Sequence, residues 1–190
     1  AESNTIALDF APGCSTITVA AQERDTHVTF EVIRVEGDTP DGVLWGPIAT
    51  SVGGTIGEIV GVARDGEAAI GIQACSIQTA GGQAGGGVGD ALHAAAETSE
   101  GAALQAYTLE ADGGIVGSKI ALFACPAADA LETLGRIEVA EGLPHPMLDG
   151  EWTKTSRAAR ESYLIANFGE DSLDEMVAAT KQAGFRYLYH

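Results

Sequence analysis

The stretch ESYLIANFGEDSLDEMVAATKQAGFRYLYH, residues 161–190, predicts a strand, a helix and a second strand in direct succession. YLIANF (163–168) is a nearly continuous apolar run, which is typical of a strand buried on both faces. RYLYH (186–190) predicts the second strand. Between them, five residues recur at helical spacing: Leu173, Met176, Val177, Thr180 and Ala183. Because such crossovers are right-handed, we expect two neighbouring parallel strands.

The ends of the predicted helix carry boundary signals. Ser172 and Glu175 have the spacing of a capping box, in which each side chain bonds the other residue's backbone N–H. Asp174 and Glu175 suit the positive end of the helix dipole, and Lys181 suits the negative end. Gly184 stands where a C′ glycine ends a helix.

A pair of parallel strands cannot cover its own faces, and all-parallel sheets occur almost only with layers on both sides. We therefore expect the chain to end inside a domain, with residues 162–190 as the first βαβ unit of a truncated TIM-type barrel. The alternative is that this unit packs on the preceding residues as a complete α+β protein. Exposure of residues 163–168 and 186–190 favours the first interpretation, and burial within the 190 residues favours the second.

The preceding residues show short β-runs separated by turns. TITVAA (16–21) and HVTFEVIRV (27–35) alternate, and the apolar face of the second run switches between Val32 and Ile33, which predicts a β-bulge. Two further pairs of runs flank turn signals: 56–63 and 68–77 around Asp65-Gly66, and 104–110 and 117–125 around residues 111–114. Hairpins in series without long helices between them predict an antiparallel β-sandwich.

The predicted chain is mainly β and has three parts. Residues 1–139 form the sandwich with a short C-terminal helix, which Pro126 opens and which spans about 127–137. Its inward stripe is Ala130, Leu131 and Leu134. Residues 140–161 form a connector, because two prolines around His145 and a glycine at position 150 disfavour regular structure. Residues 162–190 form the βαβ unit.

Composition excludes several classes of partner. Ten basic against twenty-seven acidic side chains give a formal charge of −17, which repels nucleic acid and anionic membranes. No apolar run approaches the roughly 18 residues of a membrane-spanning helix. The start, AESNTIALDF, lacks a leader pattern, so Ala1 is consistent with a mature product after cleavage or with a cut end.

Metal and cofactor signals are also weak. Cys14, Cys75 and Cys125 are widely spaced, which argues against a metal site and against a disulfide framework; buried thiols, or one bridge and one free thiol, remain open. His27 and His93 show no ligand spacing. The glycine-rich stretch 80–101 follows hairpins rather than a βαβ unit and lacks a Walker lysine, so we expect a flexible insertion, no bound nucleotide and no cofactor.

Two stretches resemble a known enzyme layout: GSKIALFACPAADALETLGRIEVAEGLPHPMLDGEW (117–152) and SYLIANFGEDSLDEMVAATKQAGFRYLYH (162–190). Together with the sandwich before them, they look like carbohydrate-active enzymes of the α-galactosidase-like glycoside hydrolase type, in which a (β/α)8 barrel follows a β-sandwich. The resemblance implies a secreted or periplasmic protein with a carbohydrate substrate. It also implies that the rest of the same polypeptide, or a second chain, completes the barrel.

In barrels, catalytic groups lie in the loops after the strands. The resemblance therefore places Asn167, Glu170 and Asp171 after the first strand, and Tyr189 and His190 at the end of the second. Two carboxyl groups about 5–10 Å apart are the usual catalytic pair in glycoside hydrolysis. Glu170 and Asp171 are weak candidates for such a pair, because loops of this kind usually carry solvated or capping acids, and the catalytic residues stay unknown.

A second candidate substrate site lies in the connector. His145, Asp149, Glu151 and Trp152 combine an aromatic face, on which a sugar ring stacks, with carboxylates that accept hydroxyl hydrogen bonds. The alternative, which we favour, is a linker whose Trp fills the gap between sandwich and barrel. The basic residues that follow suit an acidic sugar or, more commonly, an acidic neighbouring domain: Lys154, Arg157 and Arg160.

These observations lead to two functional hypotheses. The first is the N-terminal portion of a polysaccharide- or glycoside-degrading enzyme, inactive alone, with hydrolysis and elimination both open. The second is a non-catalytic β-sandwich module that binds a glycan or a partner protein through its loops.

Overall fold

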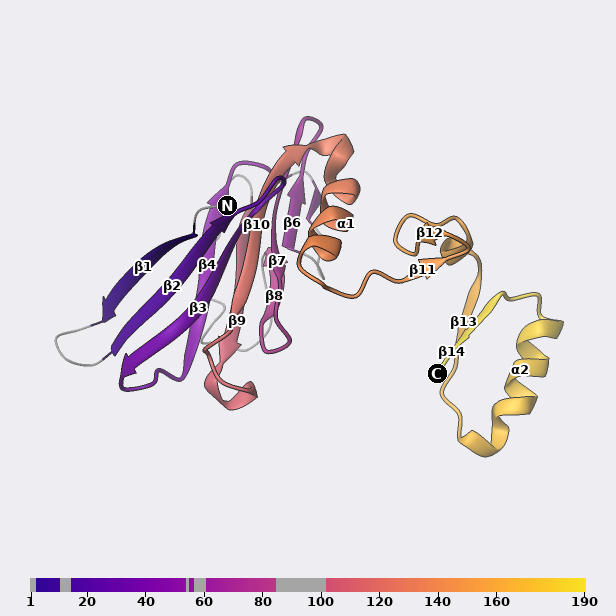
Figure 1. Ribbon diagram of the computed structural model, residues 1–190. Coiled ribbons are helices and arrows are strands. Elements are labelled where there is room, and N and C mark those ends of the chain that lie inside the picture. The colour runs from indigo at the N-terminus through magenta and orange to yellow at the C-terminus, as the bar shows by residue number, and fades with distance from the viewer. Residues whose placement is uncertain (1–2, 11–14, 54, 57–60, 85–101) are drawn as a thin grey trace. The chain divides into compact units, whose positions relative to one another are not determined.

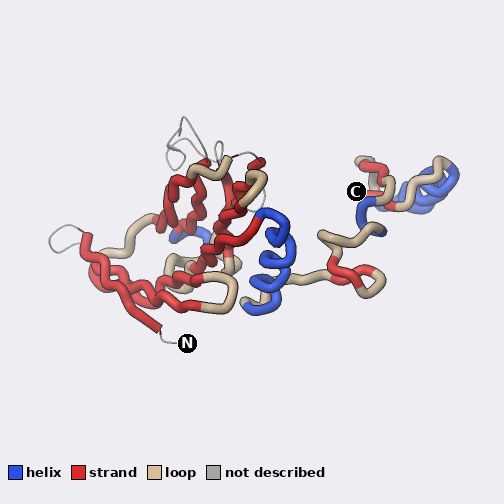
Figure 2. Tube along the Cα trace, turned by 90° about the horizontal axis from the view of Figure 1, so that it is seen from above, coloured by secondary structure: helices blue, strands red, loops and turns tan. Residues whose placement is uncertain are grey.

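The computed structural model describes residues 3–10, 15–53, 55–56, 61–84 and 102–190. Its internal contacts divide the chain into two units, 1–143 and 144–190, which we describe separately (Figures 1 and 2). Cys14, His93 and most of the glycine-rich stretch lie outside the described residues, although its start forms a strand.

Unit 1 is built from two antiparallel sheets, as the sequence predicts (Figure 1). The larger sheet has the order β1-β2-β3-β10-β7-β6-β5, and the smaller has the order β4-β9-β8. The larger sheet contains β1 (Ser3–Phe10), β2 (Ser15–Glu23), β3 (Val28–Gly37), β5 (Thr55–Ile56), β6 (Gly61–Arg64), β7 (Ala68–Ala74) and β10 (Lys119–Pro126). The smaller sheet contains β4 (Gly42–Thr50), β8 (Ala80–Ala84) and β9 (Ala102–Leu109).

The bulge predicted in the run 27–35 is confirmed. The pairing of β2 with β3 passes from Thr18↔Arg34 to Val19↔Val32, so Ile33 is the extra residue. The bulge keeps Val35 on the core side with Val32 and leaves Ile33 44% exposed.

The hairpin around Asp65-Gly66 is confirmed as well, since β6 pairs antiparallel with β7. The carboxylate of Asp65 accepts hydrogen bonds from the backbone N–H groups of Glu67 and Ala68, both at 2.8 Å. The single strand predicted at 56–63 is wrong, because its two ends belong to different strands, β5 and β6, which pair with each other.

The predicted hairpin of 104–110 with 117–125 is wrong. These residues form β9 and β10, which lie in different sheets. A short 3-10 helix, η1 (Glu110–Asp112), and Gly113 and Gly114 with positive φ connect the two sheets instead. The core lies between the sheets and includes Ile72 and Ile120 of the larger sheet and Leu104 of the smaller one.

A network of buried hydroxyl groups ties the two sheets together. Ser118, fully buried beside β10, accepts a hydrogen bond from Trp45 Nε1 of β4 at 2.8 Å. Its Oγ also lies 2.7 Å from Thr108 Oγ1 of β9 and 3.3 Å from Thr79 Oγ1. Because every member finds a partner in this network, these polar groups are tolerated in an apolar core.

We expect Ser118→Ala to lower the free energy of unfolding of unit 1 by about 1–2 kcal/mol, because the indole N–H of the half-buried Trp45 loses its acceptor and the buried hydroxyl of Thr108 loses a partner. Chemical denaturation measures this change. Thr153→Ala, which removes an exposed hydroxyl in unit 2, serves as the control and leaves the unit 1 transition unchanged. An equal effect of the two substitutions would contradict the role of the network.

One helix follows the last strand of unit 1. The 3-10 turn η2 (Ala127–Asp129) leads into α1 (Ala130–Ala140), which lies along β10 on the face of the larger sheet opposite the core (Figures 1 and 2). Ala130 and Leu134 are buried as predicted, but Leu131 is 42% exposed and the fully buried Ile137 takes its place. The helix also extends beyond the predicted end at residue 137.

Unit 2 begins with a small hairpin in the predicted connector, where the sequence analysis expected no regular structure. Strands β11 (Met147–Leu148) and β12 (Glu151–Trp152) pair antiparallel around Asp149 and Gly150, whose φ values are 52° and 84°. Two positive φ values are typical of a type I′ turn, for which Asp-Gly is a favoured sequence. A 3-10 turn, η3 (Ala158–Arg160), follows.

The rest of unit 2 is the predicted βαβ unit. Strands β13 (Tyr163–Ile165) and β14 (Tyr187–Tyr189) pair in parallel, and η4 (Glu170–Ser172) and α2 (Leu173–Gln182) connect them. Strand β13 is shorter than the predicted 163–168.

The two ends of α2 differ in how well the sequence predicted them. Ser172 is the N-cap residue but makes no side-chain capping bond, so the predicted capping box does not form. At the other end Gly184 has φ 79°, its N–H bonds the carbonyl of Lys181, and the N–H of Phe185 bonds the carbonyl of Thr180. This is the Schellman motif that a C′ glycine allows.

Candidate functional site

The β13–β14 pair has one covered and one uncovered face. Leu164 and Leu188 are paired neighbours and half-buried on the side where α2 packs against β14. On the other face, Tyr163, Ile165 and Tyr189 are 55%, 71% and 60% exposed. The rings of Tyr163 and Tyr189 meet edge to face at 5.6 Å. Unit 2 therefore presents a connected apolar face that the described residues of the same unit leave open to solvent.

The predicted barrel-mouth residues gather at the carboxyl ends of the two strands. Ala166 N–H donates to the carbonyl of Tyr189, so the pairing continues one step beyond β13. There the ring of His190 stacks on Phe168 at 4.4 Å, beside the exposed Asn167. Glu170 and Asp171 are exposed in η4, at the start of the connection to α2. Neither carboxyl group has a buried environment that would set it apart chemically.

The predicted connector cluster holds Trp152 in an enclosed position. The indole is 8% exposed, and His145 stacks on it with ring centroids 4.9 Å apart and an angle of 12°. Lys154 Nζ lies 5.2 Å from the ring centroid. Asp149 and Glu151 are exposed in the hairpin. Because the chain's own side chains already contact the ring, a sugar would have to displace one of them; sugar binding here stays a prediction.

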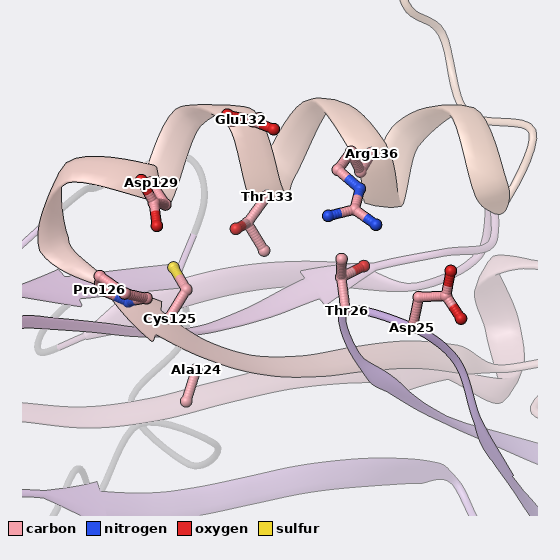
Figure 3. A pocket seen from close by; sticks show the side chains of 9 residues that line it. All are labelled: Asp25, Thr26, Ala124, Cys125, Pro126, Asp129, Glu132, Thr133 and Arg136. Atoms are coloured by element: carbon pink, nitrogen blue, oxygen red, sulfur yellow. The ribbon is translucent and has the colours of Figure 1, made fainter.

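A pocket that the sequence analysis did not identify lies in unit 1, between α1 and the sheet (Figure 3). Its volume is about 340 Å³. Two segments far apart in the sequence line it: the turn between β2 and β3, and the stretch 124–136 that runs from the end of β10 through η2 into α1. The polar lining residues are Asp25, Thr26, Cys125, Asp129, Glu132, Thr133 and Arg136.

The side chains of the pocket point across it from both walls. Figure 3 shows Arg136 directed from α1 toward Thr26, and Asp129 at the opposite end near Cys125, with Thr133 between them. Thr133 is only 7% exposed, and in the part of the chain that the structure describes its hydroxyl has no hydrogen-bond partner. Arg136 likewise forms no ion pair with a described residue.

A buried charge cluster lies near the other end of α1. The side chain of Glu141 is 2% exposed. Three nitrogen atoms surround its carboxylate oxygens: Lys119 Nζ at 2.7 Å, His27 Nε2 at 3.0 Å and Arg24 Nε at 3.4 Å. His27, which the sequence analysis treated as isolated, is thus a structural partner of Glu141. Burial alone would raise the pKa of Glu141, but the hydrogen bonds from Lys119 and His27 outweigh it and hold the pKa below its ordinary value.

Cys75 and Cys125 are free thiols. Burial, together with the nearby Glu141 carboxylate, raises the pKa of Cys75 to about 12. This thiol therefore stays protonated at neutral pH and is a poor nucleophile.

Comparisons with protein-family models, with curated protein sequences and with solved structures found no match. In the described ranges, no group of three or more His, Cys, Asp or Glu side chains is placed to hold a metal ion. Nor does any described helix have the length and apolar character needed to cross a membrane.

Proposed function

We propose that this chain is the N-terminal portion of a secreted or periplasmic enzyme that degrades polysaccharides or glycosides and that it is inactive alone. The observation that supports this proposal is the uncovered apolar face of the β13–β14 pair. Parallel strands with one helix-covered face and one open apolar face are the repeating element of a (β/α)8 barrel, where the second face packs inside.

The proposal assigns a role to each face and end of the unit. Tyr163, Ile165 and Tyr189 would pack in the barrel interior, and the strand ends that carry Asn167 and His190 would open toward the substrate. Acid–base chemistry would come from residues beyond His190, in the same polypeptide or in a second chain that completes the barrel.

The reading frame downstream of the codon for His190 tests this proposal. We expect about six further strand–helix repeats, and we expect the longer polypeptide to release sugars from a polysaccharide panel that the 190-residue chain leaves intact. A stop codon at this point, or a continuation without such repeats, would refute the proposal.

The substitution Ile165→Ala tests whether the exposed face of β13 becomes packed in the longer polypeptide. In the 190-residue chain we expect a change in stability within about 0.5 kcal/mol, because Ile165 is 71% exposed. In the longer polypeptide we expect a loss of about 2 kcal/mol, because the side chain would be in a core. Hydrogen exchange of the α2 amides measures both changes. Leu164→Ala, on the face toward α2, is the control and should cost the same in both proteins.

A second candidate function is a non-catalytic module that binds a glycan or a partner protein, and the open pocket beside α1 favours it. Under this alternative, the 190-residue chain functions by binding alone and takes part in no catalysis. An active longer enzyme would argue against it.

A further inference from the structure

We infer that the pocket beside α1 in unit 1 binds one neutral sugar residue through its hydroxyl groups. The pocket does not depend on a completed barrel; only the choice of a sugar among polyhydroxylated ligands rests on the proposed function.

The first argument is the unused hydrogen-bonding capacity of Thr133. Thr133 is only 7% exposed as a residue and lines the pocket, and among the described residues nothing bonds its hydroxyl. The hydroxyl is not among the fully enclosed polar atoms, so it is open to the pocket. A ligand hydroxyl at this position can bond it in place of solvent.

The second argument is the alternation of donors and acceptors around the pocket. Arg136 only donates hydrogen bonds, and the hydroxyls of Thr26 and Thr133 both donate and accept them. The carboxylates only accept them: Asp25, Asp129 and Glu132. A sugar hydroxyl donates one hydrogen bond and accepts others, so a ring bearing several of them matches a lining that mixes all three kinds of group.

The charges of the pocket disfavour the competing ligands. A metal ion would stand beside the Arg136 guanidinium, and an anion would meet three carboxylates, those of Asp25, Asp129 and Glu132, on a chain of formal charge −17. An apolar ligand would strip water from these charged groups without replacing their hydrogen bonds. The described lining also offers no aromatic ring, so binding depends on hydroxyl contacts, and we expect dissociation constants in the millimolar range.

Titration of the ¹⁵N-labelled 190-residue chain with neutral D-glucose, D-galactose, D-mannose and D-xylose tests the inference. We expect at least one sugar to shift the amide resonances of Thr26, Cys125 and Thr133 saturably below about 100 mM. Thr133→Val and Arg136→Gln should each weaken this binding roughly fivefold or more, because the first removes the hydroxyl and the second replaces the charged guanidinium donors by a shorter neutral amide. Amide spectra of the unliganded variants establish that each one is folded.

Thr5→Val, which removes an exposed hydroxyl on β1, is the matched control and should leave affinity unchanged. Glucuronate, spermidine and calcium chloride are titrated in parallel. The inference is overturned if no neutral sugar shifts these amides, if only the charged probes do, or if the folded variants bind as well as the parent. None of these results bears on the reading frame beyond His190, so this inference and the proposed function fail separately.

Discussion

Replacing Phe123 by alanine is expected to lower the free energy of unfolding of unit 1 by about 3–5 kcal/mol. Phe123 is 4% exposed and lies on the face of β10 that α1 covers. Its paired neighbour on β7 is Gly71, and a Cβ added there would lie 2.4 Å from two atoms of the Phe123 ring. The ring thus fills the space above a glycine, and alanine at position 123 would leave a cavity.

The two tryptophans of this chain allow the unfolding of unit 1 to be measured separately from that of unit 2. Trp45 lies in unit 1 and Trp152 in unit 2, so the fluorescence of a Trp152→Phe background follows the denaturation of unit 1 alone. Val139→Ala, at a position on α1 that is 65% exposed, is the control and should change stability by less than about 0.5 kcal/mol. A loss below about 1 kcal/mol for Phe123→Ala would show that α1 does not seal this face.

Glu141→Gln is expected to destabilise unit 1 by about 3 kcal/mol, at the low end for a broken buried ion pair. The substitution leaves the buried His27 and the Lys119 ammonium without a carboxylate partner. The low end applies because the side chains of Lys119 and Arg24 are 22% and 38% exposed and so keep contact with water. Glu36→Gln, which breaks the exposed pair with Arg34, is the control and should cost less than about 1 kcal/mol.

The same carboxylate gives the stability of unit 1 a predictable dependence on pH. Because the pKa of Glu141 is lower in the folded chain than the ordinary value of a glutamate, the carboxylate stabilises the fold fully above that ordinary value. The contribution disappears as pH falls through the lowered pKa. The stability difference between the parent and Glu141→Gln should therefore shrink as the pH falls from about 7 to values below the ordinary pKa of a glutamate. A difference that grows toward acid would contradict this assignment.

Local signals predicted several elements well. The switch of apolar face at Ile33 indicated the bulge, Asp65-Gly66 indicated a hairpin, and Gly184 indicated the end of α2. Each of these features depends on the conformational preferences of a few neighbouring residues. The Asp149-Gly150 hairpin carried an equally local signal, which the flanking prolines obscured.

The errors concern partners that are distant in the sequence. The sequences of β9 and β10 are compatible with a hairpin, but the competing pairs with β4, β8, β3 and β7 place them in separate sheets. On α1, Leu131 and Ile137 both fit an apolar stripe, and only the position of the sheet decides that Ile137 is the buried one.

The same distinction between local and long-range contacts applies to the candidate sites. The amino-acid sequence by itself determined the mainly β character, the acidic charge and the parallel strand pair, because these follow from composition and local periodicity. Only the tertiary structure brought the turn at Asp25, the end of β10 and Arg136 of α1 around one pocket and left the hydroxyl of Thr133 without a described partner. The physical reason is that burial and unpaired polar groups depend on contacts between segments about 100 residues apart, which no local pattern encodes.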